Sequence, residues 1–289
     1  MRVLAAALLA LWTLVSCTPR PAPAGEPALW RIADADSEIW LFGAVHVLPP
    51  DLRWRSARFD AAFDAAEELV VETDADAAIT ATLAARYGVL PAGERLTARL
   101  APSSAARLRR VAAQVRLDAA ALENLRPWLA ALRLSFAYAL ADGQAPEAGV
   151  EAVLMPAARG AGKRISFLET PEQQIRTLAD LSEPDQLRFL NASLRQIEEE
   201  GDSLAALDAA WARGDVAALD ALLRAQLHEA GEAPYAAIIT RRNAAWTEAI
   251  AQRLDGSGRI FYAVGSAHLI GEGGVVALLR ARGINVERL

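Results

Sequence analysis

The chain has 289 residues, of which 53% are hydrophobic and 23% are charged, so it is long and apolar enough to bury a large core. Its formal net charge of −6 argues against the basic surface typical of nucleic-acid-binding proteins, and we expect no nucleic-acid partner. Length alone is compatible with one domain or two.

The first residues have the pattern of a secretory signal. A basic Met1-Arg2 start is followed by an apolar block that is too short to span a bilayer comfortably, and then by small residues. Leu14-Val-Ser-Cys17 is similar to the bacterial lipoprotein signal, in which the cysteine becomes the lipidated first residue. The alternative is an incidental cysteine in an ordinary signal peptide that is cleaved nearer Ala22 to Ala24.

We therefore expect three segments: a signal peptide over residues 1–16, a flexible tether over 17–27 and a single domain over 28–289. The lipid on Cys17 would anchor the protein in the cell envelope, on the periplasmic face. Thr18, rather than Asp, after the cysteine favours the outer membrane in a Gram-negative host.

Short apolar runs predict strands at both ends of this domain. Residues 29–33 and 39–45 flank a polar turn and predict a hairpin. Helical spacing over 54–68 and an apolar run over 69–72 complete a strand–helix–strand unit, whose two strands should be parallel.

Helices dominate the middle of the chain. The remaining segments are predicted as helices over 77–87, 103–115, 127–140 and 146–159, a strand over 163–169, a helix capped by Thr170, helices over 183–254 interrupted near Gly201, Gly214 and Gly231, a strand over 259–264, a helix over 275–282 and a strand over 284–289. On the helix over 127–140 we expect Trp128, Leu132 and Phe136 to share one face. The fold class is therefore mixed α/β, with a central mixed sheet, flanking helices and a large helical insertion.

Two of the three histidines occur in the same local pattern, a buried strand followed by Gly-x-x-His. The pattern ends at His46 in one segment and at His268 in the other. Ligands collect beyond the carboxyl ends of strands in sheets with helical connections, so the pair predicts a site. The alternative for each histidine is a hydrogen-bonded structural residue. The third, His228, lies in a helical region and is expected at the surface.

Carboxylates follow two further predicted strands, at Glu72 and Glu169. If the strands are neighbours, two imidazoles and two carboxylates meet at one edge, which would suit a catalytic divalent metal. Such a metal could activate water, and the remaining carboxylate could act as a general base. Each glutamate could instead simply cap the helix that follows it.

Two other features could bind an anion. Glycines at Gly271-Glu-Gly-Gly274 precede a helix, where backbone N–H groups can approach a negative group, although a flexible turn explains them equally well. Arg242 and Asn243 lie in a predicted helix, and an arginine facing the site could hold a substrate carboxylate or stabilise an oxyanion. Ordinary surface charge is the alternative.

Taken in order, these motifs resemble the TraB/GumN family, which includes the Tiki proteins. The resemblance rests on Leu-Phe-Gly-Ala-Val-His46, Val-Val-Glu72, Phe-Leu-Glu169-Thr with Gln173 or Gln174 behind it, Arg242-Asn243 with Trp246, and Ala-Val-Gly-Ser-Ala-His268, and it runs from about Leu29 to Leu289. It implies an EreA/ChaN-like or Tiki-like fold and a site built from His46, Glu72, Arg242 and His268. Glu169 is our own addition. Where the family often has Gly-x-Asp, this chain has Gly149-Val-Glu151, which leaves the role of that position open.

The resemblance also implies a function, because Tiki-like members are divalent-metal-dependent proteases that act outside the cell. We therefore expect a lipid-anchored envelope peptidase or related hydrolase that acts on a peptide or protein and uses manganese, cobalt or zinc. The metal ligands would be His46, His268, Glu72 and Glu169, the catalytic residues Glu72 and Arg242, and the substrate-binding residues Arg242, Asn243 and Gly271. The alternative is a non-catalytic metal- or haem-binding envelope lipoprotein, and an envelope scaffold is a third possibility.

Overall fold

The structure is a computed structural model that describes residues 25–289, apart from residue 75 and residues 200–202. The strands are β1 (Leu29–Ala33), β2 (Ser37–Ala44), β3 (Glu68–Val71), β4 (Arg164–Phe167), β5 (Gly258–Gly265) and β6 (Glu287–Arg288). The helices are α1 (Ala57–Ala65), α2 (Ala77–Gly88), α3 (Pro102–Gln114), α4 (Pro127–Ala141), α5 (Val150–Gly160), α6 (Pro171–Ala179), α7 (Glu183–Glu199), α8 (Ser203–Ala212), α9 (Val216–Glu229), α10 (Glu232–Tyr235), α11 (Arg241–Leu254), α12 (Ser266–Leu269) and α13 (Val275–Ala281). A π-helical turn, η4 (Ala236–Thr240), connects α10 to α11, and short 3-10 turns lie at Leu96–Arg99, Ala119–Leu122 and Pro146–Ala148.

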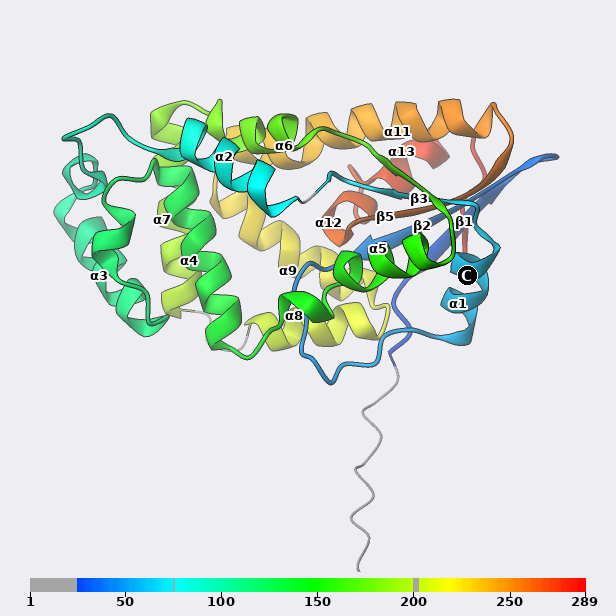
Figure 1. Cartoon of the computed structure of the whole chain (residues 1–289), viewed down its shortest axis with the longest axis horizontal. Coiled ribbons are helices and arrows are strands. Elements are labelled where there is room, and N and C mark those ends of the chain that lie inside the picture. Colours follow the sequence, from blue (N-terminus) through cyan, green and yellow to red (C-terminus); the bar gives the residue numbers. More distant parts are fainter. Residues whose placement is uncertain (1–24, 75, 200–202) are drawn as a thin grey trace, which may run out of the picture.

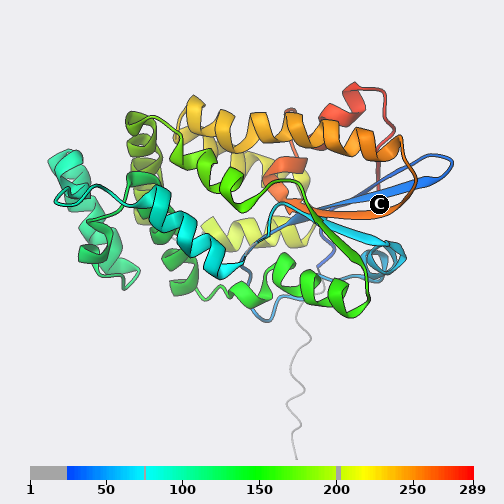
Figure 2. The same cartoon turned by 45° about the horizontal axis from the view of Figure 1, so that its top comes forward.

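The described strands form one mixed sheet in the order β4-β3-β5-β2-β1-β6. Strands β4, β3, β5 and β2 are parallel neighbours, whereas β1 runs antiparallel to both β2 and β6. Figures 1 and 2 show α11 and α13 on one side of the sheet and α1 and α5 on the other. The predicted mixed α/β class with a large helical insertion is thus confirmed.

The predicted strand–helix–strand unit exists, but its two strands are not adjacent. Strands β2 and β3 are parallel, and β5, from the far end of the chain, pairs with both of them. Residue Ala44 at the end of β2 lies opposite Gly265, while Val71 at the end of β3 lies opposite Ala263. This insertion brings the two Gly-x-x-His motifs side by side.

The core around the sheet is rich in aromatic side chains, because parallel strands covered by helices on both faces are apolar on both faces. Phe42 on β2 packs edge to face on Phe59 of α1, with ring centroids 4.7 Å apart, and Trp54 stacks on the same Phe42 ring. Helix α1 begins at Ser56, whose side chain accepts a hydrogen bond from the Phe59 backbone. These contacts fix the segment that leads away from His46.

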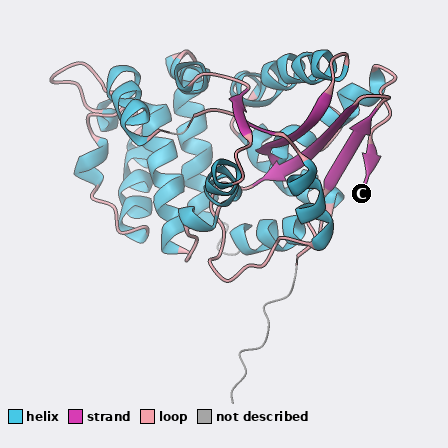
Figure 3. Cartoon of the chain, turned by 45° about the vertical axis from the view of Figure 1, so that its right-hand side comes forward, coloured by secondary structure: helices cyan, strands magenta, loops and turns pink. Residues whose placement is uncertain are grey.

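A second core lies in the helical part of the molecule, around α3, α4 and α7, away from the sheet (Figure 3). Trp128 on α4 is fully buried there. Leu132 and Phe136, predicted to share a helix face with Trp128, are 41% and 49% exposed, so that face is only partly buried. Helix α4 is apolar almost all round, so its sequence periodicity does not identify the buried face.

The helix expected after Thr170 has the predicted cap. The Thr170 side chain accepts from the Gln173 backbone N–H, and the Gln173 side chain accepts from the Thr170 N–H, which forms a capping box. Within the described residues, none of the helices has the length and apolarity needed to cross a membrane.

Candidate functional site

The carboxyl ends of four parallel strands meet at one edge of the sheet and carry the polar residues singled out from the sequence. Glu72 directly follows β3, Glu169 follows β4 by two residues, and each histidine lies just beyond β2 or β5. Since β4, β3, β5 and β2 are consecutive in the sheet, segments far apart in the sequence converge there. His46, however, has different immediate neighbours from the other three residues.

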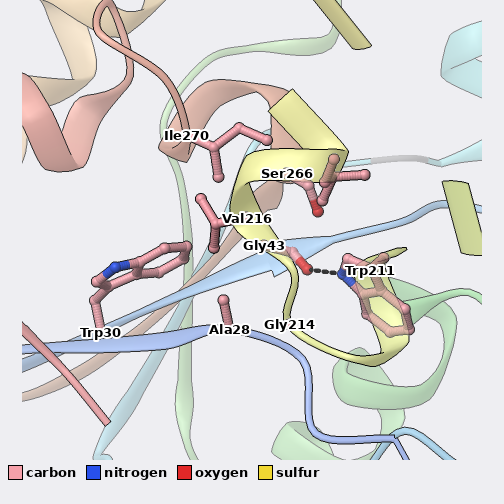
Figure 4. Close-up of a pocket in the computed structure, with 9 residues that line it drawn as sticks. Ala28, Trp30, Gly43, Trp211, Gly214, Val216, Ser266 and Ile270 are labelled. Atoms are coloured by element: carbon pink, nitrogen blue, oxygen red, sulfur yellow. Dashed lines mark hydrogen bonds between the residues drawn. The ribbon is translucent and has the colours of Figure 1, made fainter. Parts of the chain in front are cut away.

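The glycine of the first Gly-x-x-His motif allows the second motif to approach it closely. A Cβ on Gly43 would lie 2.8 Å from Ser266 Oγ, too close for any side chain. The Ser266 hydroxyl donates to the Ala44 carbonyl at 3.0 Å, and the Trp211 indole N–H donates to the Gly43 carbonyl at 2.7 Å (Figure 4). The two motifs therefore interlock through backbone contacts, independently of their histidines.

The glycine of the second motif holds a carboxylate. The Gly265 N–H donates to Glu72 Oε1 at 2.7 Å, and a Cβ at this position would approach that oxygen to 3.0 Å. Glu72 Oε2 accepts from Arg242 Nη2 at 2.6 Å and from Gln174 Nε2 at 3.3 Å. The carboxylate is buried, and these donors hold it in one orientation.

The guanidinium of Arg242 lies at the centre of the cluster and uses every N–H donor that it has. Its contacts are Nε to Glu169 Oε2 at 3.1 Å, Nη1 to the Ile238 carbonyl at 3.3 Å and to His268 Nε2 at 2.9 Å, and Nη2 to Glu72 Oε2 at 2.6 Å and to Glu169 Oε1 at 2.5 Å. The Trp246 ring, 4.5 Å from the guanidinium carbon, covers one face. Arg242 thus has no free donor for a substrate carboxylate.

The π-helical turn η4 places this arginine. A π-turn shifts the register of the following helix and often occurs at functional sites. Ile238, in that turn, supplies the carbonyl that accepts from Arg242. The next residue, Asn243, is fully buried and donates to the Gly273 carbonyl at 2.8 Å, while its side-chain oxygen lies 2.6 Å from His268 Nδ1.

His268 is buried between two partners that fix its tautomer. Because the Asn243 oxygen can only accept, Nδ1 carries the proton, and Nε2 accepts from Arg242. Burial lowers the pKa of His268 to about 4, with the charge of Arg242 acting in the same direction against the pull of Glu72. The ring is therefore neutral at neutral pH, and both of its nitrogens are occupied.

The two buried glutamates differ in pKa. Burial opposes ionisation of Glu72, but His268 and Arg242, with His46 further off, lower its pKa below the usual value. Burial raises the pKa of Glu169 above its usual value even though Arg242 opposes this, and the charge on Glu72 adds to the rise. Two carboxylates that share one cation thus split into a stable carboxylate and a group that retains a proton more readily.

His46 lies in the open, with a 67% exposed side chain, and its Nδ1 is 2.9 Å from Glu151 Oε1. The charge of Glu151 raises the pKa of His46 to about 9, against the effect of desolvation. Within the described part of the chain, Glu151 Oε1 is a buried atom whose contact with His46 is this ion pair. His46 Nε2 has no hydrogen-bond partner among the described residues, so it is free to meet a ligand.

Gly149 makes this pairing possible. A Cβ there would lie 2.0 Å from the His46 carbonyl oxygen, and the following Val150 N–H donates to the Val45 carbonyl at 3.0 Å. The start of α5 is thus pressed against the backbone of the first motif, which brings Glu151 to His46. The Gly-x-Glu pattern was the only sequence signal for this contact.

Two clefts adjoin the Arg242 cluster. One, of about 610 Å³, is lined by His46, Glu72 and Glu151 and by Val71, Thr73, Asp74, Asp76, Ala152, Met155, Pro156, Arg159 and Gln174. The other, of about 580 Å³, is lined by Glu169, Arg242 and Trp246 together with neighbouring residues of α6 and α11. Only the first of these combines an exposed imidazole with an ionised carboxylate.

The remaining predicted site residues lie elsewhere. Gly271 has a φ of +78° and packs against the Asp220–Arg224 ion pair, where a Cβ would come within 2.4 Å of Asp220 Oδ1. Asn243 holds His268 in place and has its other side-chain contact with a backbone carbonyl. His228 is exposed on α9 and stacks on Tyr235. Cys17 and the predicted signal peptide lie outside the described residues.

The cluster, as arranged, does not fit a bound divalent metal. The imidazole of His268 and the carboxylates of Glu72 and Glu169 converge, but all three accept hydrogen bonds from Arg242. Within the described residues, no group of three or more His, Cys, Asp or Glu side chains is placed to hold a metal ion. The predicted ligand His46 is directed instead to Glu151.

Comparison with known proteins agrees with the motifs. The chain is 26% identical to the uncharacterized protein YbaP of Escherichia coli K12 over 255 residues. This match covers 88% of the chain and 92% of the relative. The uncharacterized protein YbaP of Shigella flexneri matches with the same identity and coverage. No solved structure matches the chain significantly. The sequence matches the TraB/PrgY/gumN family over residues 28–288, and the chain therefore belongs to this family.

Proposed function

We propose that the protein is a hydrolase that cleaves a peptide or related acyl bond in the cleft lined by His46, Glu72 and Glu151. The observation that carries the proposal is the exposed His46 imidazole, paired with Glu151 through Nδ1 and free at Nε2. A histidine oriented by a carboxylate on one nitrogen, with the other nitrogen open to a cleft, is suited to acid–base catalysis. The peptide class of the substrate rests on the resemblance to Tiki-like proteases.

The raised pKa of His46 determines its part in the reaction. At neutral pH the ring is protonated, so Nε2–H can donate to a carbonyl oxygen or to a leaving group. Glu151 stabilises that charge, and the carboxylate of Glu72 adds to it from the floor of the cleft. In this resting state His46 already carries the proton that it would donate as the general acid.

The reaction also needs a general base that accepts a proton from the attacking water. Glu72 is best suited to this role. Its pKa is lowered, so it remains a carboxylate, and it lines the same cleft as His46. Of the roughly four lone-pair positions of a carboxylate, three are used by Gly265, Arg242 and Gln174, which leaves about one for water. Arg242 then serves as a positioning residue for Glu72 rather than as a clamp for the substrate.

Activity of the purified protein on a peptide library, followed by mass spectrometry, tests the proposal. His46→Gln should reduce kcat/KM by about 10² to 10⁴, the usual contribution of a positioned acid or base. His228→Gln, which removes an exposed histidine that does not line the cleft, is the matched control and should leave the rate unchanged. A rate that depends on protonated His46 should fall as pH rises through about 9, and Glu151→Gln should move that fall to lower pH. Cleavage that is undiminished in His46→Gln would refute the proposal.

The metal-dependent form of the hydrolase remains a second candidate, because His268, Glu72 and Glu169 do converge. It requires Arg242 to leave their centre, and we derive no catalytic step through a metal. Elemental analysis of the purified protein beside His268→Gln tests it. Stoichiometric manganese, cobalt or zinc in the wild type that is lost in the variant would favour this candidate.

We also propose that the protein acts in the cell envelope, anchored through a lipid on Cys17. The support is the signal-like sequence of residues 1–17 alone. Fractionation of cells that express Cys17→Ser tests it. The variant should move from the membrane fraction to the soluble fraction, whereas an unchanged distribution would argue against the anchor.

A further inference from the structure

The cluster around His268 has the composition of a metal site but contains an arginine at its centre. One neutral imidazole nitrogen and two carboxylates surround a single guanidinium, and these residue types are the ligands that zinc, manganese or cobalt take. Asn243 holds the far nitrogen of His268, as outer residues do for metal-binding histidines. The point on which these groups converge is occupied by the Arg242 guanidinium.

We infer that Arg242 is the resident cation of this site, so that its guanidinium takes the place of a divalent metal among His268, Glu72 and Glu169. The inference concerns the cluster alone and does not depend on which reaction the neighbouring cleft performs. It also explains how two buried carboxylates can lie together, since each receives charge-assisted hydrogen bonds from the same guanidinium.

Several contacts make this cation permanent. The side chain of Arg242 is only 12% exposed, the Ile238 carbonyl accepts from Nη1, and Trp246 stacks on the guanidinium face. Burial opposes the charge, yet Glu72 and Glu169 raise the pKa of Arg242 above its usual value. The arginine therefore does not leave by losing its proton at any physiological pH.

Two of the three acceptors are also held by groups other than Arg242. Glu72 is tied to the Gly265 N–H and to Gln174, and His268 is tied to Asn243. Removal of the guanidinium should thus leave the His268 nitrogen and the Glu72 carboxylate in place, beside the carboxylate of Glu169. Such a set of ligands should then accept a divalent ion that the wild-type protein does not bind.

Titration with cobalt(II) tests the inference, because the d–d absorption of the ion reports ligation directly. Arg242→Ala should bind cobalt(II) stoichiometrically and gain thermal stability from it, whereas the wild type should show neither effect. The double variant Arg242→Ala/His268→Gln should lose the gained binding. Arg241→Ala removes the exposed neighbouring arginine, whose side chain has no ion pair or hydrogen bond within the described residues, and it should behave like the wild type.

Two further variants keep the test decisive if Arg242→Ala does not fold. Arg242→Met fills the space without charge and should also gain cobalt(II) binding, whereas Arg242→Lys restores a cation and should not. The inference is overturned if the wild type binds cobalt(II) stoichiometrically and His268→Gln abolishes that binding. It is equally overturned if folded Arg242→Ala or Arg242→Met binds no more cobalt(II) than the wild type.

Discussion

His46 and His268 end the same local sequence pattern on parallel, adjacent strands, yet they occupy opposite environments. His46 is exposed, paired with Glu151, and has its pKa raised to about 9. His268 is buried, hydrogen-bonded at both nitrogens, and has its pKa lowered to about 4. The Gly-x-x-His motif therefore determines where each imidazole lies, while residues from distant parts of the chain determine its charge.

The difference follows from which elements cover each strand end. The turn after β5 lies against α11, which supplies Arg242 and Asn243 to His268. The turn after β2 lies against the first turn of α5, which supplies Glu151. His268, in the second motif, is thus a buried structural part of the Arg242 cluster. His46, in the first motif, is the exposed group that lines the cleft.

The largest expected difference between the two histidines is in how much each contributes to the stability of the fold. His268→Ala should lower the free energy of unfolding by about 4 kcal/mol, because it creates a cavity beside Trp246 and removes one buried hydrogen-bond partner from each of Asn243 and Arg242. His46→Ala should cost under about 1 kcal/mol, since it breaks a largely exposed ion pair. Urea denaturation at pH 7 measures both, and equal losses in the two variants would contradict the comparison.

A somewhat smaller effect should appear in the pH dependence of stability. The folded pKa of His268 is about 4, below the ordinary 6.5, so the unfolded chain takes up the proton first as the pH falls. The stability is complete above about pH 6.5 and is lost between 6.5 and 4, by about 3 kcal/mol in total. For His46 the sign is opposite, because its raised pKa contributes stability below 6.5 that is lost as the pH rises through about 9.

Urea midpoints measured across the acidic range, for the wild type and for His268→Gln, check this prediction. The stability of His268→Gln should fall less steeply with decreasing pH, because the contribution of His268 is missing. His228→Gln is the control for loss of a histidine elsewhere. If the wild type and His268→Gln lose the same stability between about pH 6.5 and 4, His268 does not titrate as the structure indicates.

The sequence was sufficient to predict the sheet edge, because the evidence for it is local. Apolar runs followed by a polar residue marked the strand ends at His46, Glu72, Glu169 and His268, with a glycine before each histidine, and the structure brings all four to one edge. The capping box at Thr170 was equally local. Such features need only a few consecutive residues to be recognised.

The interior of the site could not be predicted in the same way, because it depends on long-range packing. Nothing local shows that β5 enters between β2 and β3, or that Arg242 turns inward while its neighbour Arg241 remains exposed. That choice follows from the π-turn before α11 and from the need of two buried carboxylates for a cation. The exposed Leu132 and Phe136 on α4 show the same limit in the helical part.

The most direct test is an NMR titration of the imidazole protons, made simple by a chain with three histidines. In a His228→Gln background two signals remain, and the structure predicts that His46 titrates near pH 9 and His268 near pH 4. Glu151→Gln should return the His46 signal toward 6.5 and leave that of His268 in place. Two signals that titrate together near 6.5, or a His268 signal that titrates above that of His46, would contradict the division of roles between the two motifs.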